Sequence, residues 1–72
     1  MTIAEQIKQT IGSLKSVEAS FELFSYQTKD TAAKQAFTEA TTVTQQVIDA
    51  LETRLMIVEK EEPQYKTSGQ KQ

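Results

Sequence analysis

The 72-residue sequence contains no cysteine and no histidine. The absence of cysteine excludes disulfides and thiolate metal sites as sources of stability. The absence of histidine removes the commonest transition-metal ligand and the usual acid–base group near neutral pH. A chain of this length forms one domain at most, and a single small hydrophobic core is only marginally stabilising. Association with another copy is the remaining way to stabilise such a fold.

The sequence also lacks an excess of positive charge and any long apolar run. Its net charge of −2 argues against nucleic-acid binding, which normally requires a basic patch. The longest apolar run is Leu55 to Val58, whereas a membrane-spanning helix needs about 20 apolar residues. Residues Met1 to Glu5 lack the charged start and apolar segment of a secretory signal. We therefore expect a cytoplasmic protein that neither binds nucleic acid nor inserts into a membrane.

The spacing of apolar residues predicts two amphipathic helices. Apolar residues recur every three or four positions in the first half, as on one face of a helix: Ile3, Ile7, Ile11, Leu14, Val17, Phe21 and Phe24. The second half repeats this spacing: Ala33, Phe37, Ala40, Thr44, Val47, Leu51, Arg54 or Leu55, and Val58. Between them, Asp30 is a good N-cap, and Thr28 is the alternative. A turn this short forces the helices to lie antiparallel.

These patterns predict an all-α, antiparallel two-helix hairpin over residues 1–62. The helices are expected at about 2–28 and 31–62, with the turn at about 28–30. Pro63 ends the second helix, because proline removes an intrahelical hydrogen bond and clashes with the preceding turn. The polar residues 63–72 show no periodicity, so a flexible tail is predicted there.

Antiparallel pairing about this turn places Phe21 against Phe37, and Leu14 against Val47. Further apolar residues then remain beside the contact or away from it: Leu23, Tyr26, Val43, Ile48, Met56 and Ile57. Because a contact between two helices is narrower than this apolar surface, we expect another surface to cover the excess. A second hairpin completing a four-helix bundle is the simplest solution, with a homodimer favoured. Binding of a different protein is the alternative.

Two single residues carry competing interpretations. Arg54, the only arginine, either pairs with a carboxylate on a neighbouring helix, such as Glu5, or lays its stem along apolar surface. Gly12 either allows a partner helix to come close or is a tolerated surface glycine.

Residues able to carry out catalysis are scarce. Glu18 and Glu22, and also Glu52 and Glu59, are pairs of carboxylates on one helix, and they motivate an alternative function as a metal-binding bundle or hydrolase. No histidine completes such a site, so solvated surface charge is the favoured interpretation. A serine or threonine nucleophile near the helical contact would need a base, and no triad spacing supports Lys15 or Lys34 in that role. Hydrogen bonding of these hydroxyls to the carbonyl one turn earlier is the commoner role. We predict no catalytic residue, no metal ligand and no cofactor.

Several short segments resemble a known family. They are Gln9-Thr10 with Ser13-Leu14-Lys15, then Gln27-Thr28, Ala33-Lys34, Leu51, Arg54 and, most specifically, Glu61-Glu62-Pro63-Gln64-Tyr65. With these residues the chain resembles DUF1657, a family of small helical proteins of unknown function from spore-forming Firmicutes. The resemblance implies a link to sporulation and work beside a membrane protein of the spore, and it assigns no catalytic residue. We also predict a partner contact in the segment at the end of the second helix and the start of the tail: Glu61, Glu62, Pro63, Gln64 and Tyr65.

Overall fold

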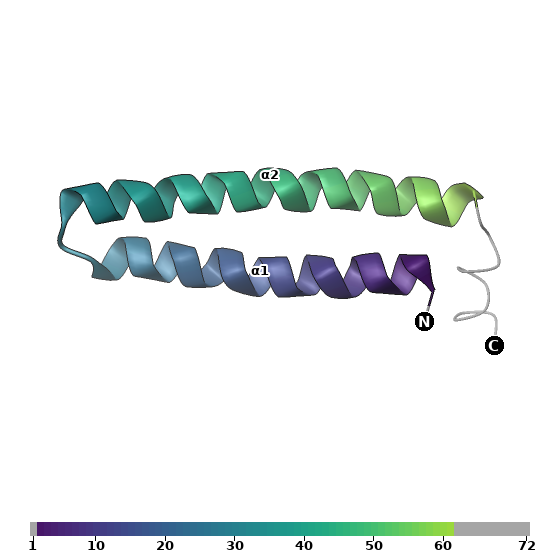
Figure 1. Cartoon of the computed structure of the whole chain (residues 1–72), viewed down its shortest axis with the longest axis horizontal. Coiled ribbons are helices and arrows are strands. Elements are labelled where there is room, and N and C mark those ends of the chain that lie inside the picture. The colour runs from purple at the N-terminus through teal and green to yellow at the C-terminus, as the bar shows by residue number, and fades with distance from the viewer. Residues whose placement is uncertain (1, 62–72) are drawn as a thin grey trace.

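The computed structural model describes residues 2–61, which form two long helices. Helix α1 spans Ile3–Gln27 and α2 spans Thr31–Glu61. The helices run antiparallel and side by side along their whole length, joined by one short turn (Figure 1). The predicted all-α hairpin is therefore confirmed. The predicted tail, residues 63–72, lies outside the described residues.

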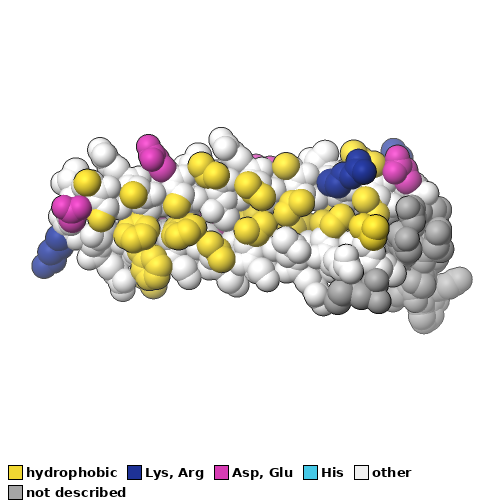
Figure 2. Space-filling model, in the orientation of Figure 1, with side chains coloured by type: hydrophobic (Ala, Val, Ile, Leu, Met, Phe, Trp, Pro, Cys, Tyr) yellow, Lys and Arg dark blue, Asp and Glu magenta, His cyan; other side chains and the backbone are white. Residues whose placement is uncertain are grey.

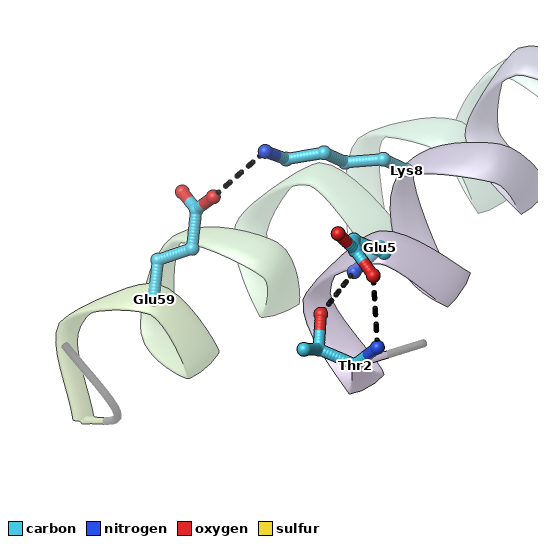
Figure 3. Close-up of polar contacts among 4 residues, drawn as sticks. All are labelled: Thr2, Glu5, Lys8 and Glu59. Atoms are coloured by element: carbon cyan, nitrogen blue, oxygen red, sulfur yellow. Dashed lines mark hydrogen bonds and ion pairs between the residues drawn. The ribbon is translucent and has the colours of Figure 1, made fainter. Parts of the chain in front are cut away.

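A capping box fixes the start of α1. The Glu5 N–H donates to the Thr2 hydroxyl at 3.1 Å, and the Glu5 carboxylate accepts from the Thr2 N–H at 3.0 Å (Figure 3). These bonds satisfy two amide groups that a helix end leaves without partners. The backbone hydrogen bond from Thr2 is the main cause that lowers the pKa of Glu5. Because the pKa of Glu5 is lowered, its ionised carboxylate stabilises the fold at pH values above the ordinary glutamate pKa. This stabilisation is lost as the pH falls through the lowered pKa.

The turn is closed by one cap on each side. The Thr28 N–H donates to the Phe24 carbonyl at 3.0 Å, which ends α1. The Asp30 carboxylate accepts from the Ala33 N–H at 2.8 Å, so Asp30 is the N-cap of α2, as the sequence predicts. No residue from Thr28 to Asp30 has a positive φ, which is why this turn needs no glycine.

The two helices meet along a seam of buried and half-buried residues, most of which are spaced by three or four positions. On α1 these residues are Ala4, Ile7, Ile11, Leu14, Glu18, Phe21 and Ser25. On α2 they are Ala33, Phe37, Ala40, Thr41, Thr44, Ile48, Leu51, Leu55 and Val58. This spacing is that of a coiled coil, in which each side chain inserts between residues of the facing helix. Ile48 is the most deeply buried of them, at 1% exposed.

The burial of Ile48 corrects one of our predictions. We placed Ile48 outside the contact and Val47 within it, but Val47 is 43% exposed. Both residues fit the apolar spacing of a helix. Between Thr44 and Leu51, a step of three followed by a step of four passes through Val47, and the reverse order passes through Ile48. The helix is rotated toward Ile48, so this side chain packs against α1 and is unavailable to a partner. Ile3, Val17 and Phe24, which we also assigned to the contact, are likewise largely exposed.

Hydroxyl residues fill part of the seam without leaving polar groups unsatisfied. The Ser25 hydroxyl donates to the Glu22 carbonyl at 2.7 Å, and that of Thr44 donates to the Ala40 carbonyl at 2.7 Å. Thr41 makes the same bond to Phe37 at 2.9 Å. This is the predicted bonding to the preceding turn, and it lets these side chains sit at a helical interface.

An aromatic cluster closes the seam beside the turn. The Phe21 and Phe37 rings are stacked with centroids 6.4 Å apart, and the Phe24 ring lies 5.4 Å from Phe37. The predicted contact of Phe21 with Phe37 is confirmed. Phe37 is thus the one ring of α2 that packs against two rings of α1.

Gly12 lies on open helix surface, and a Cβ atom built there would meet nothing within 4 Å. The neighbouring helix therefore makes no close approach at this glycine. We expect Gly12→Ala to raise the free energy of unfolding by about 1 kcal/mol, since alanine has the higher helix propensity. Urea denaturation monitored by circular dichroism measures this change. A loss of stability would show that another surface packs closely at this position.

Within residues 2–61, no helix is long and apolar enough to cross a membrane.

Candidate functional site

One flank of the hairpin carries two ion pairs that join the helices. Lys8 Nζ lies 3.2 Å from Glu59 Oε2 (Figure 3), and Lys15 Nζ lies 3.4 Å from Glu52 Oε2. The two lysines are two helical turns apart, as are the two glutamates, so both pairs repeat along the same side. Exposed ion pairs contribute between zero and about 1 kcal/mol each. Their main effect is therefore on the register of the two helices rather than on stability.

These pairs bear on the alternative of a carboxylate metal site. Glu52 and Glu59, two of the carboxylates that motivated it, are each engaged by a lysine. In the part of the chain that the structure describes, no three acidic side chains gather where they could hold an ion. The geometry therefore offers no support for that alternative.

Arg54 does not make the contact with Glu5 that we considered. The Glu5 carboxylate is used by the capping box, and the described ion pairs do not include Arg54. Arg54 is exposed and follows Val47 by two helical turns, which places it on the same side of α2 as that residue.

The opposite flank is apolar and is not covered by any part of the described chain. Val17 lies two residues after Lys15, and Ile57 lies two residues before Glu59, so each is about 200° around its helix from a paired charge. We define the apolar flank as six large side chains that are between 37% and 56% exposed: Ile3, Val17, Phe24, Val43, Val47 and Ile57. Figure 2 shows an apolar band running along the length of the hairpin over both helices. Single exposed apolar residues are normal on a protein surface, but a continuous band of them is typical of an interaction surface.

The apolar flank is hollowed at its turn end. An open hollow of about 340 Å³ is lined by Phe24, Gln27, Thr28 and Phe37. The exposed edges of two phenylalanine rings make its wall apolar, and such a wall suits an aliphatic or planar side chain from another surface.

The predicted interface residues divide into three groups. Val43 and Ile57 lie on the apolar flank, and Arg54 lies beside it. Ile48 is buried within the seam. Leu23, Tyr26 and Met56 lie away from the apolar flank, and Tyr26 and Met56 are 73% and 70% exposed. Of the predicted contact segment, Glu61 is exposed at the end of α2, and Glu62, Pro63, Gln64 and Tyr65 lie outside the described residues.

The sequence spacing places four members of the apolar flank in the helical contact rather than on the surface: Ile3, Val17, Phe24 and Val47. The sequence assigns them to the helical contact, because apolar spacing alone does not tell which edge of a stripe faces the partner helix. A signal that separates the edges does exist, since Lys8 and Lys15 have the same two-turn spacing as Glu52 and Glu59. Equal spacing of opposite charges on two antiparallel helices predicts that they pair along one side of the contact. The apolar residues on the other side are then the exposed ones.

A second hollow, on the other side of the turn, is lined mainly by polar residues. It measures about 200 Å³ and is lined by Glu22, Ser25, Tyr26, Thr38, Thr41 and Thr42. All four of its serine and threonine hydroxyls donate to carbonyls of their own helix. With these protons engaged, the hollow presents no activated nucleophile.

Comparison with known families gives one match, which covers residues 7–55. It includes most of both helices, the turn and the greater part of the apolar flank. No curated protein and no solved structure matches the chain. Since the match spans more than half of the sequence, the chain belongs to DUF1657, a family described as protein of unknown function.

Proposed function

We propose that this chain is a non-enzymatic interaction module that pairs with a second copy of itself through the apolar flank, forming a four-helix bundle. The observation that carries the proposal is the flank itself, six large apolar side chains in line on one side of a two-helix fold. Two helices can bury only a narrow strip of each other, so a further layer is needed to remove this surface from water.

The size of the flank is in the range that supports a dimer. Full burial of a large aliphatic or aromatic side chain contributes about 1.5–3 kcal/mol, and these six are already about half buried. Each copy then gains about 6 kcal/mol, and two copies gain about 12 kcal/mol. Loss of translational and rotational freedom costs about 4 kcal/mol or more. The balance corresponds to micromolar or weaker affinity.

The biological setting belongs to the proposal as well. The sequence resemblance implies a role in sporulation and an association with a membrane protein of the spore. A small paired hairpin suits an adaptor in such an assembly, because its other faces remain free after the apolar flank is covered. Leu23, Tyr26 and Met56 are the exposed apolar residues on those faces.

The test compares two substitutions of the same chemistry on different faces. We expect the natural chain to elute as a dimer in size-exclusion chromatography with light scattering, at tens of micromolar. Val47→Glu places a charge in the centre of the apolar flank and should convert the dimer to a monomer. Met56→Glu places the same charge away from the apolar flank and should leave the dimer intact.

A stable, helical monomer formed by the natural chain at these concentrations would contradict the proposal. In that case the apolar flank would be left for a different protein, which is the alternative partner. Equal effects of Val47→Glu and Met56→Glu on the mass would also contradict it, because they would show that the apolar flank has no special part in association.

A further inference from the structure

We infer that the two copies pack head to tail, so that the turn of one hairpin lies beside the open end of the other. This inference rests on the proposed function and adds its geometry. A twofold axis across the middle of the apolar flank and perpendicular to the helices produces this arrangement. It stacks α1 on α1 and α2 on α2, with each stacked pair antiparallel.

The first argument is the distribution of side-chain size along α2. The side of α2 that belongs to the apolar flank reads, at alternating steps of four and three, Ala36, Ala40, Val43, Val47, Ala50, Arg54 and Ile57. The two residues nearest the turn are both alanine, and the two nearest the open end, Arg54 and Ile57, are among the largest. A second α2 running antiparallel therefore sets its bulky end against the small end of the first. Val47 stays near the axis. Large against small is the complementarity that a packed core requires.

The second argument is the charge on this surface. Between residues 33 and 57, Arg54 is the only charged residue on the apolar flank side of α2, and it is exposed. If both turns lay at the same end, the two Arg54 side chains would lie at the same level of the bundle, where two guanidinium groups repel. The head-to-tail arrangement places them at opposite ends instead. Each then lies near the turn half of the other copy.

The turn half of the second copy offers a suitable environment for Arg54. Its α2 carries only alanine at positions 36 and 40, which leaves room for a long side chain. Its α1 has no basic residue in the last turn, so no side chain of that turn offsets the partial negative charge at the helix end. The exposed ring of Phe24 adds a face on which a planar guanidinium can stack.

Distance measurement between spin labels tests the arrangement, and the absence of native cysteine allows single labels to be introduced. Lys29→Cys places a label on an exposed side chain of the turn that does not line the hollow of the apolar flank. The middle of α1 lies about 12 residues before the end of that helix, so two labels in the turns should be about 36 Å or more apart in the head-to-tail dimer. With both turns at one end, the labels would be less than about 20 Å apart, since neighbouring helices are spaced by 8–10 Å.

A label at Ser16→Cys serves as the matched control. Ser16 is exposed and lies near the middle of α1, so its distance is similar in either arrangement and reports only that a dimer has formed. A distance below about 20 Å for Lys29→Cys, together with a dimer distance for Ser16→Cys, would overturn the head-to-tail arrangement and leave the proposed function standing. No dipolar coupling from either label, together with a monomer mass, would overturn both.

Discussion

Ile48→Ala is expected to lower the free energy of unfolding by about 3 kcal/mol. Ile48 is 1% exposed, and no other described large side chain is buried so completely. Replacing a buried isoleucine by alanine removes apolar contacts and leaves a cavity that the neighbours fill only partly, which typically costs 2–5 kcal/mol. For a small domain this is a large share of the total stability. We therefore expect a clear loss of the folded state at temperatures that the natural chain withstands.

Urea denaturation followed by circular dichroism gives this change directly, at equal chain concentration for all variants, because association contributes to apparent stability. Met56→Ala is the matched control, since Met56 is on the same helix and 70% exposed. The control should change the free energy of unfolding by less than about 0.5 kcal/mol. Equal effects of the two substitutions would show that Ile48 is not the centre of the seam.

Phe37→Ala is expected to lower the free energy of unfolding by about 3 kcal/mol, an effect similar in size to that of Ile48→Ala. The Phe37 ring lies 6.4 Å from Phe21 and 5.4 Å from Phe24, so one truncation removes both aromatic contacts between the helices. Loss of a packed phenylalanine typically costs 3–5 kcal/mol, and the partial exposure of Phe37 places the effect at the lower end.

The control for Phe37→Ala is Tyr26→Ala, an aromatic truncation near the turn on a side chain that is 73% exposed. We expect the midpoint of urea denaturation to fall strongly for Phe37→Ala and to change little for Tyr26→Ala. If Phe37→Ala leaves the midpoint unchanged, the aromatic cluster does not hold the turn ends of the helices together.

The hairpin itself could be predicted from sequence because three local signals agree. Two stripes of apolar residues define the helices, and Asp30 marks where the second one starts. Phe21 and Phe37 lie at matching distances from the turn, and they do pack together. Each of these signals depends on neighbouring residues or on distance from the turn, which a sequence records directly.

The rotation of each helix about its own axis could not be predicted in the same way. Val47 and Ile48 are adjacent and both apolar, so either one completes a stripe between Thr44 and Leu51. The choice depends on how hydroxyl residues such as Ser25, Thr41 and Thr44 are accommodated. They enter the seam because they bond to the preceding turn, and Val17 and Phe24 are displaced to the surface. The composition of the apolar flank therefore became visible only in three dimensions.

The position of the aromatic cluster beside the turn has a consequence for the order in which the hairpin forms. Phe24 and Phe37 are linked only by residues 25–36, whereas Lys8 and Glu59 are linked by residues 9–58. Closing the shorter loop costs less chain entropy, so the aromatic contact should form first and the helices should then zip toward the open end. Amide hydrogens should accordingly exchange fastest near Ile3 and Glu61 and slowest near the rings.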